Sequence, residues 1–322
     1  MSALTIVMYH YVRDLARCRH PRLKALTIEA FEGQLDYLAR HYQVVSVRDV
    51  VAAAHGARPL PPGACLLTFD DGFEDHFSVV LPRLRARGFS AGFYPPAVAV
   101  EERRVLDTHK VHVILAAASD HTKVARRIQE LIEEQRCVWD LPAADTLYQE
   151  LAQPSRFDTA EVIFIKRSLQ RALPAPLRTA ITQRLFDEYA GADEATVAAE
   201  LYMTRDQLRA MVDEGMDVGG HGADHVWLGG LPASEQASEI ERTRTFLASV
   251  HGRPVENWVM CYPFGSYDAT TLELLRGAGC ALGLTTRVDV AKDLAAPLEL
   301  PRLDTNDLPT RGDAGASKWA CQ

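Results

Sequence analysis

Short apolar runs alternate with amphipathic stretches over the first hundred residues of the chain. Each apolar run is bounded by turn-forming or capping residues, which is typical of a buried strand. The stretches between them repeat apolar residues at helical spacing, as from Ile28 to Leu38 after the N-cap residue Thr27. The predicted strands are 4–8, 42–45, 65–69 and 89–94, and the predicted helices are 28–38, 46–56 and 73–87. Repeated strand–helix units predict a parallel sheet or barrel with helices on its outside.

This alternation stops near residue 97 and resumes near residue 204. Between them the sequence has helical patterns with many Arg and Glu residues and no convincing strand, so we expect a helical insertion. The α/β pattern resumes at Thr204, which forms a capping-box signature with Gln207. The later predicted strands are 216–219, 258–262 and 281–285, and the later predicted helices are 205–213, 234–250 and 269–276.

These changes of pattern predict four parts along the chain. Residues 1–96 and 204–303 form the two parts of one α/β domain, 97–203 form the insertion, and 304–322 form a C-terminal tail. The tail is rich in small and polar residues, so we expect it to be loosely ordered.

Composition narrows the class of protein. With 47% hydrophobic and 24% charged residues, the chain has the balance of a globular protein with a sizeable core. Its net charge of −8 argues against nucleic acid or anionic lipid as the main partner. The six cysteines are scattered without a C-x-x-C pair, which favours a reducing compartment. The first residues lack a signal-peptide pattern, and no window has the roughly 18 apolar residues of a membrane span, so we expect a cytoplasmic location.

Two adjacent carboxylates, Asp70 and Asp71, follow the predicted strand 65–69. One Asp would suffice to cap the next helix. Two side by side repel each other unless a cation or a proton is shared. Helix capping and a metal or perturbed-pKa site are therefore both open at this strand end.

Two imidazoles, His221 and His225, lie four residues apart after a strand that ends in two glycines. This spacing allows both rings to face one point, as metal ligation requires, although the spacing alone occurs readily by chance. Together with Asp71 they would provide one carboxylate and two imidazoles. That set suits Zn²⁺ and other late first-row divalent ions and leaves positions for water and substrate.

Two further strand ends carry candidate groups. Residues 261–268 (CYPFGSYD) follow an apolar strand, and their Pro and Gly residues set an unusual backbone path. This segment is either an ordinary strand–helix joint capped by Asp268 or a wall whose backbone N–H groups face an oxyanion. His10 ends the first strand between two tyrosines, where a lone histidine is more often structural.

Three of these segments, TFDDG, H-x-x-x-H and YPFGSYD, resemble the successive motifs of the polysaccharide deacetylases, carbohydrate esterase family 4. The resemblance covers about residues 1–100 and 204–303. It implies a distorted (β/α) barrel of about seven strands, here with a helical insertion. It also implies a metal-dependent hydrolase that removes acetyl groups from sugars.

The resemblance also implies roles for individual residues. Asp70 would be the general base, and Asp71, His221 and His225 the metal ligands. In a subgroup with rearranged motif order, an N-terminal Tyr-His supplies the general acid, which would be His10 here. The groups expected to contact the substrate or its oxyanion are Tyr9, Pro263, Phe264 through its backbone N–H, and Arg302.

The chain departs from the family pattern at several positions. Gly222 follows the first metal histidine where Ser or Thr is usual, and Cys261 stands where many members have Arg. No histidine follows His251, so the usual C-terminal leucine–histidine motif is missing. Arg302 is a candidate to hold Asp70 in place of the missing guanidinium. In the insertion, His109 and Lys110 are candidates to bind an anionic group, although a solvated helix face is the commoner role.

We therefore predict a deacylase of a sugar in an intracellular glycan precursor, linked to a nucleotide or a lipid. Zn²⁺ is the expected cofactor, with Co²⁺, Ni²⁺ or Mn²⁺ as alternatives. Two other functions stay open: hydrolysis of a small cyclic amide or formamide, and carbohydrate binding without catalysis. No motif indicates the sugar, the acyl group or the oligomeric state.

Overall fold

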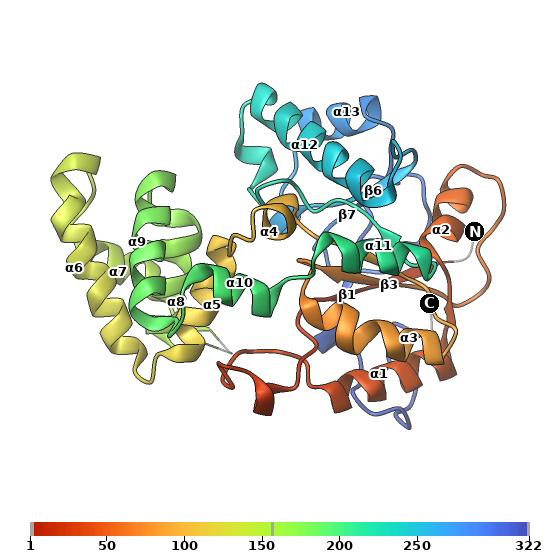
Figure 1. The fold of residues 1–322 in the computed structure, drawn as a ribbon, viewed down its shortest axis with the longest axis horizontal. Coiled ribbons are helices and arrows are strands. Elements are labelled where there is room, and N and C mark those ends of the chain that lie inside the picture. The colour runs from red at the N-terminus through yellow and green to blue at the C-terminus, as the bar shows by residue number, and fades with distance from the viewer. Residues whose placement is uncertain (1–2, 156–157, 321–322) are drawn as a thin grey trace. The chain divides into compact units, whose positions relative to one another are not determined.

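The computed structural model describes residues 3–155 and 158–320 and divides into two compact units (Figure 1). The described residues of the first unit are 3–14, 25–104 and 199–320. The second unit combines 105–198 with 15–24, a segment that the sequence pattern assigns to the first part of the barrel. The predicted four-part domain division itself stays a prediction.

In the described part of the first unit, seven parallel strands form a closed ring, and an eighth strand, β2, lies outside it. One sheet has the order β5-β4-β3-β1-β8, with β2 paired to β3 off this path, and a second sheet pairs β6 with β7. Single parallel bridges, Gly220 to Met260 and Leu284 to Leu300, join the two sheets at both sides. The strands are β1 (Leu4–Tyr9), β2 (Gln43–Val44), β3 (Ala64–Asp70), β4 (Ala91–Tyr94), β5 (Asp217–Val218), β6 (Trp258–Cys261), β7 (Cys280–Leu284) and β8 (Leu303–Asp304). The predicted distorted (β/α) barrel of about seven strands is confirmed.

Side chains alternate between the inside and the outside of this ring, as the two-residue period of a strand requires. Leu4, Ile6 and Leu66 belong to one buried cluster, which also holds residues of β6 and β7. Val7 and Tyr9 belong to a second cluster with residues of the surrounding helices. Inward residues of β1 and β3 thus have even numbers, and Asp70, the last residue of β3, is one of them.

Helices surround the ring and begin where the sequence indicates. Thr27 caps α1 through its side chain, and Thr204 and Gln207 form the predicted capping box of α11. Figure 1 shows α1 and α3 side by side, where Arg87 pairs with Glu32. The helices of this unit are α1 (Ile28–His41), α2 (Val47–Ala54), η2 (His76–Val80), α3 (Leu81–Ala86), α4 (Ala97–Glu101), α11 (Arg205–Asp213), η4 (Leu228–Gly230), α12 (Ala233–His251), η5 (Pro263–Gly265), α13 (Ala269–Gly277) and η6 (Thr305–Asp307).

The helix predicted from residue 73 begins three residues later, with the π-helical turn η2. Asp71 and Gly72 have φ values of 70° and 69°, which are left-handed and cannot continue into a right-handed helix. Phe73 then forms a bridge with Tyr202. The strand end is therefore followed by a shaped loop rather than by an immediate helix.

The regular secondary structure of the second unit is helical in its described residues, with turns and loops between the helices. Its elements are η1 (Leu15–Arg17), α5 (Asp107–Ala117), α6 (His121–Trp139), α7 (Ala144–Leu151), α8 (Ala160–Arg167), η3 (Ser168–Ala172), α9 (Ala175–Tyr189) and α10 (Glu194–Leu201), the last of which runs into the range of the first unit. His109 and Lys110 are buried, and the Lys110 ammonium pairs with Glu194 at 3.0 Å. The expectation of a solvated helix face at these two residues is therefore wrong, and the charge of Lys110 is paired with a carboxylate rather than facing an open anion site.

The expectation of a loosely ordered tail is also wrong for its described residues. The Ser317 N–H donates to the Tyr37 hydroxyl at 2.9 Å, and the Gln34 side chain donates to the Thr305 carbonyl at 2.7 Å. Leu308 is buried, and Trp319 packs against the core. Small, polar composition did not reveal these contacts, because the hydrogen bonds join side chains of α1 to backbone groups of the tail.

Replacing Gly33 by Ala tests this packing. A Cβ at Gly33 would overlap the Thr310 carbonyl oxygen, whereas at Gly277, also helical, it would meet nothing within 4 Å. Alanine is otherwise favoured in a helix by about 1 kcal/mol. We expect Gly33→Ala to lower the free energy of unfolding by about 1–3 kcal/mol, as overpacking does, and Gly277→Ala to leave it unchanged or raise it. Equal urea midpoints for the two variants would contradict a packed tail.

Candidate active site

Asp71, His221 and His225 converge at the carboxyl end of the barrel strands. The Nε2 atoms of the two histidines lie 3.2 Å apart, and each lies 3.4 Å from Oδ1 of Asp71. Three ligands at about 2.1 Å from one tetrahedral ion would be separated by about 3.4 Å. The three atoms therefore have the spacing of ligands around one small divalent cation, and we call these residues the metal triad.

The proton of His221 is directed away from the triad. Its Nδ1 lies 2.8 Å from the carbonyl oxygen of Cys261 and donates a hydrogen bond to it. The nitrogen available to bind an ion is therefore Nε2. A backbone carbonyl on the far nitrogen is the usual way in which a metal-binding imidazole is oriented. The donor chemistry of the triad thus fits a divalent cation such as Zn²⁺.

Left-handed backbone conformations shape the loops that carry the triad. Asp71 and His225 have φ values of 70° and 56°, which are unusual for residues with a side chain. Such conformations persist only where the surroundings impose them, and they gather at functional sites. Gly72 and Gly222 also have positive φ, and a Cβ at Gly72 would come within 2.5 Å of Pro95.

Asp70, next to the triad, forms a buried ion pair with Arg302. The guanidinium donates to Oδ1 at 2.9 Å and to Oδ2 at 2.8 Å, and neither side chain is more than 2% exposed. Burial by itself raises the pKa of Asp70, but the charge of Arg302 outweighs it and lowers the pKa to about 2. Asp70 is therefore ionised across the neutral range.

Arg302 also contacts Cys261, which stands where many polysaccharide deacetylases have Arg. Its guanidinium lies 3.0 Å from Sγ of Cys261, which in turn lies 3.3 Å from Oδ2 of Asp70. Asp70, Cys261 and His221 could by their spacing form a second metal group. The guanidinium already places a positive charge against two of these three residues, so the metal triad is the better cation site.

His10 lies at the edge of the same site. Its Nε2 is 3.9 Å from Oδ2 of Asp70, and its side chain is 41% exposed. The His10 carbonyl accepts a hydrogen bond of 2.8 Å from Nε2 of His76. Burial lowers the pKa of His76 to about 4, so this second histidine is neutral and acts as a support.

Tyr9 does not reach the site, which corrects the expectation that it contacts the substrate. It is fully buried, stacks on Phe69 at 4.8 Å and meets the ring of Phe31 edge-on at 5.4 Å. The reason is the alternation along β1, since an odd-numbered residue points outward to the helices when His10 points to the barrel.

The third motif, residues 262–268, borders residues 221–225, which we call the histidine loop because they begin and end with the two triad histidines. Pro263 is buried and lies 3.3 Å from the position of a Cβ on Gly222. Phe264 has a φ of 58°, and its ring lies 4.7 Å from the ring of His225. The Phe264 ring also stacks on the ring of Trp227, and the two ring centroids are 4.5 Å apart. Both rings are partly buried.

Two residues that the motif analysis missed belong to this site, Glu239 and Trp227. One Glu239 oxygen accepts hydrogen bonds from the N–H groups of Ala223 and Asp224, both at 3.0 Å, in the loop between the two triad histidines. Arg242 joins Glu239 and Asp224 by ion pairs. The only sequence signal was a Glu and an Arg three residues apart on a helix, which is common. Trp227 could have been suspected as an aromatic residue two positions after His225.

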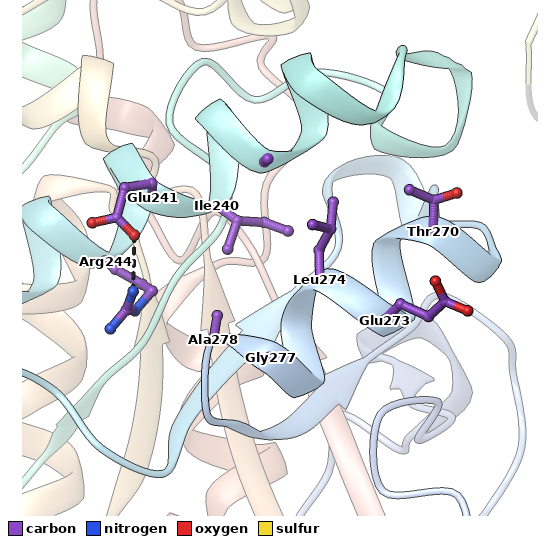
Figure 2. Close-up of a pocket in the computed structure, with 9 residues that line it drawn as sticks. Ile240, Glu241, Arg244, Thr270, Glu273, Leu274, Gly277 and Ala278 are labelled. Atoms are coloured by element: carbon purple, nitrogen blue, oxygen red, sulfur yellow. Dashed lines mark hydrogen bonds and ion pairs between the residues drawn. The ribbon is translucent and has the colours of Figure 1, made fainter.

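A groove of about 520 Å³ lies on the surface between α12 and α13 (Figure 2). Ile240 and Leu274 form its apolar part, and Glu241 pairs with Arg244 at its edge. It shares no residue with the metal triad, and it has no cluster of ligating groups among its lining residues. We therefore place the candidate site at the strand ends.

A family model described as polysaccharide deacetylase matches residues 179–283, a range that holds His221, His225 and the third motif but not Asp70. An Escherichia coli K12 protein, poly-β-1,6-N-acetyl-D-glucosamine N-deacetylase, is 33% identical over 95 residues. Those residues are 29% of this chain and only 14% of that protein.

Solved structures match over most of the chain. The Streptococcus pyogenes deacetylase PplD in complex with acetate aligns with a TM-score of 0.56 at 16% identity, over 94% of this chain and 92% of that one. IcaB from Ammonifex degensii aligns with a TM-score of 0.56 at 19% identity, over 94% and 91%. These structures share the fold of this chain, and the family model and the E. coli relative support the family resemblance. Within the part of the chain that the structure describes, no helix is both long and apolar enough to cross a membrane.

Removing the Arg302 charge should destabilise the barrel. Arg302→Gln leaves a buried carboxylate unpaired, which typically costs about 3–5 kcal/mol. Because the ion pair lowers the pKa of Asp70, its stabilisation is present above the ordinary Asp pKa of about 4 and is lost as the pH falls toward 2. The gap in unfolding free energy between wild type and variant should shrink over that range in urea titrations.

A double-mutant cycle separates the pair from general damage to the core. Asp70→Asn combined with Arg302→Gln should be destabilised by less than the sum of the two single variants, by about 1–3 kcal/mol. Simple additivity would contradict the pairing.

Glu239→Ala should weaken metal binding without removing any ligand. Loss of an outer partner of this kind typically costs 10–100-fold in affinity, so we expect at least a roughly tenfold weaker Co²⁺ titration by absorption spectroscopy. Glu241→Ala is the control, because Glu241 lies on the same helix and its ion pair with Arg244 is at the surface. Equal Co²⁺ affinity for the two variants would remove Glu239 from the site.

Proposed function

This chain is related to the polysaccharide deacetylases, and from that premise we propose that it is a metal-dependent hydrolase that removes an acyl group from a sugar. The observation that carries the proposal is the convergence of the metal triad with a buried, ionised Asp70 and a partly exposed His10. A carboxylate and an imidazole 3.9 Å apart beside a cation site are the groups that amide hydrolysis needs.

Asp71, His221 and His225 would hold the metal. The bound ion would supply Lewis acidity, which polarises the acyl carbonyl and makes water a better nucleophile. The triad uses one carboxylate and two neutral imidazoles, so it leaves positive charge at the site to attract an acyl oxygen.

Asp70 would accept the proton of the attacking water. Arg302 keeps this carboxylate ionised and holds both of its oxygens by hydrogen bonds, and by lowering the pKa of Asp70 it also makes the carboxylate less basic. His10 would donate a proton to the leaving nitrogen, and its exposure allows it to meet the substrate. The Phe264 N–H is our candidate to donate to the oxyanion, because its left-handed conformation turns the backbone of the third motif beside His225.

For the substrate, we propose an N-acetylated amino sugar such as N-acetylglucosamine. The E. coli relative is named for deacetylation of a polymer of that sugar, and this chain spans 14% of that protein's length. A nucleotide- or lipid-linked glycan precursor in the cytoplasm is the form of the substrate we propose, with Zn²⁺ as the ion.

Metal content and acetate release test the proposal together. Protein purified without chelator should carry about one divalent ion per chain, and Asp71→Ala and His221→Ala should lose both the ion and activity. Asp70→Asn should keep the ion but release acetate at least about 100-fold more slowly, as loss of a general base does. Thermal melts of every variant identify any that fail to fold.

The substrate panel contains acetylated amino sugars, formamides and cyclic amides. Acetate release from the sugars alone is the expected result. Turnover of the other amides alone would replace the sugar in our proposal, and absence of metal after reconstitution would overturn the mechanism.

A further inference from the structure

Two aromatic side chains beside the metal triad have no part in the proton transfers above. The rings of Trp227 and Phe264 lie 5° from parallel, with centroids 4.5 Å apart. Phe264 also meets the ring of the triad residue His225 at 4.7 Å. We name Trp227 and Phe264 the aromatic platform.

Two loops from different strands hold this platform in place. Trp227 follows β5 and the metal histidines, while Phe264 lies in η5 after β6. The loops are tied together where the Gly229 N–H donates to Oγ of Ser266 at 3.2 Å. A Cβ at Gly229 would come within 2.8 Å of the Tyr267 backbone, so the two loops are in close contact. The platform is therefore part of a built wall rather than a pair of loose side chains.

The conformation of Phe264 supports the same conclusion. A φ of 58° is costly for an aromatic residue and persists only if its surroundings impose it. Both platform rings are nevertheless only partly buried, unlike the fully buried aromatic side chains of the core such as Phe69 and Phe93. The fold thus holds apolar aromatic surface at the edge of a polar, charged site.

This combination matches the chemistry of a sugar ring. Ligand sites pair aromatic walls with a few placed polar groups. A pyranose has C–H bonds on its faces and hydroxyl groups around its rim, so a face can pack on an aromatic ring, whose own face is electron-rich. An anionic or purely polar ligand would gain little from Trp227.

We infer that the aromatic platform is a pyranose-binding subsite, which stacks a sugar ring of the acylated substrate and so positions the acyl group at the metal triad. This inference rests on the proposed function for the identity of the sugar. The platform residues are positioning residues, since their side chains move no proton.

Binding and kinetics of Trp227 variants test this subsite. Calorimetry with N-acetylglucosamine oligomers in the Asp70→Asn background should show about tenfold weaker binding for Trp227→Ala, whereas Trp227→Tyr, which keeps a ring, should retain most of the affinity. With Asp70 intact, Trp227→Ala should raise KM by a similar factor and change kcat little. Metal content should equal that of the wild type.

Trp139→Ala is the matched control, because Trp139 is also partly buried but lies in α6 of the helical unit. Oligomer affinity for Trp227→Ala equal to that for Trp139→Ala would overturn the subsite, as would loss of metal in Trp227→Ala or absence of oligomer binding in all variants. Oligomer binding that depends on Trp227 without any acetate release by the wild type would support the subsite and overturn the proposed function.

Discussion

A guanidinium with no exposed surface lies among the strand ends of the barrel, and the arrangement of the site follows from how its charge is satisfied. Burial of an unpaired cation costs several kcal/mol, so Arg302 requires a partner of opposite charge. Asp70 provides it with two short hydrogen bonds, and the Thr285 carbonyl accepts from Nε at 2.9 Å. The pair connects the segment before β8 with the end of β3, on opposite sides of β1 in the sheet order.

The same pair accounts for Cys261 at the position where many polysaccharide deacetylases have Arg. The guanidinium reaches Asp70 from another strand end, and the smaller Cys261 side chain leaves room for it within 3.0 Å of Sγ. An arginine at both positions would put two buried cations against one carboxylate, which would be unfavourable. A guanidinium thus lies against Asp70 in this chain too, although it comes from residue 302 rather than from position 261.

Around this centre the loops are held in conformations that the isolated chain would not favour. Asp71, His225 and Phe264 each have a positive φ, and each faces the metal triad or belongs to it. Their cost is offset by contacts elsewhere, such as the two N–H groups that Glu239 accepts. The positions of the three triad side chains are therefore supported by contacts within the protein itself.

The sequence by itself determined the repeating strand–helix units, the helix caps at Thr27 and Thr204, and the residues Asp70, Asp71, His221 and His225 as candidates. These features are local or depend on short spacings, so one segment is enough to reveal them. Only the tertiary structure decided that Tyr9 points into the core, that Arg302 pairs with Asp70, that Glu239 supports the histidine loop and that the tail packs on α1. Each of these depends on which residues the closed barrel brings together from distant parts of the chain. Strand register and side-chain direction decide such contacts, and neither is visible in composition or spacing.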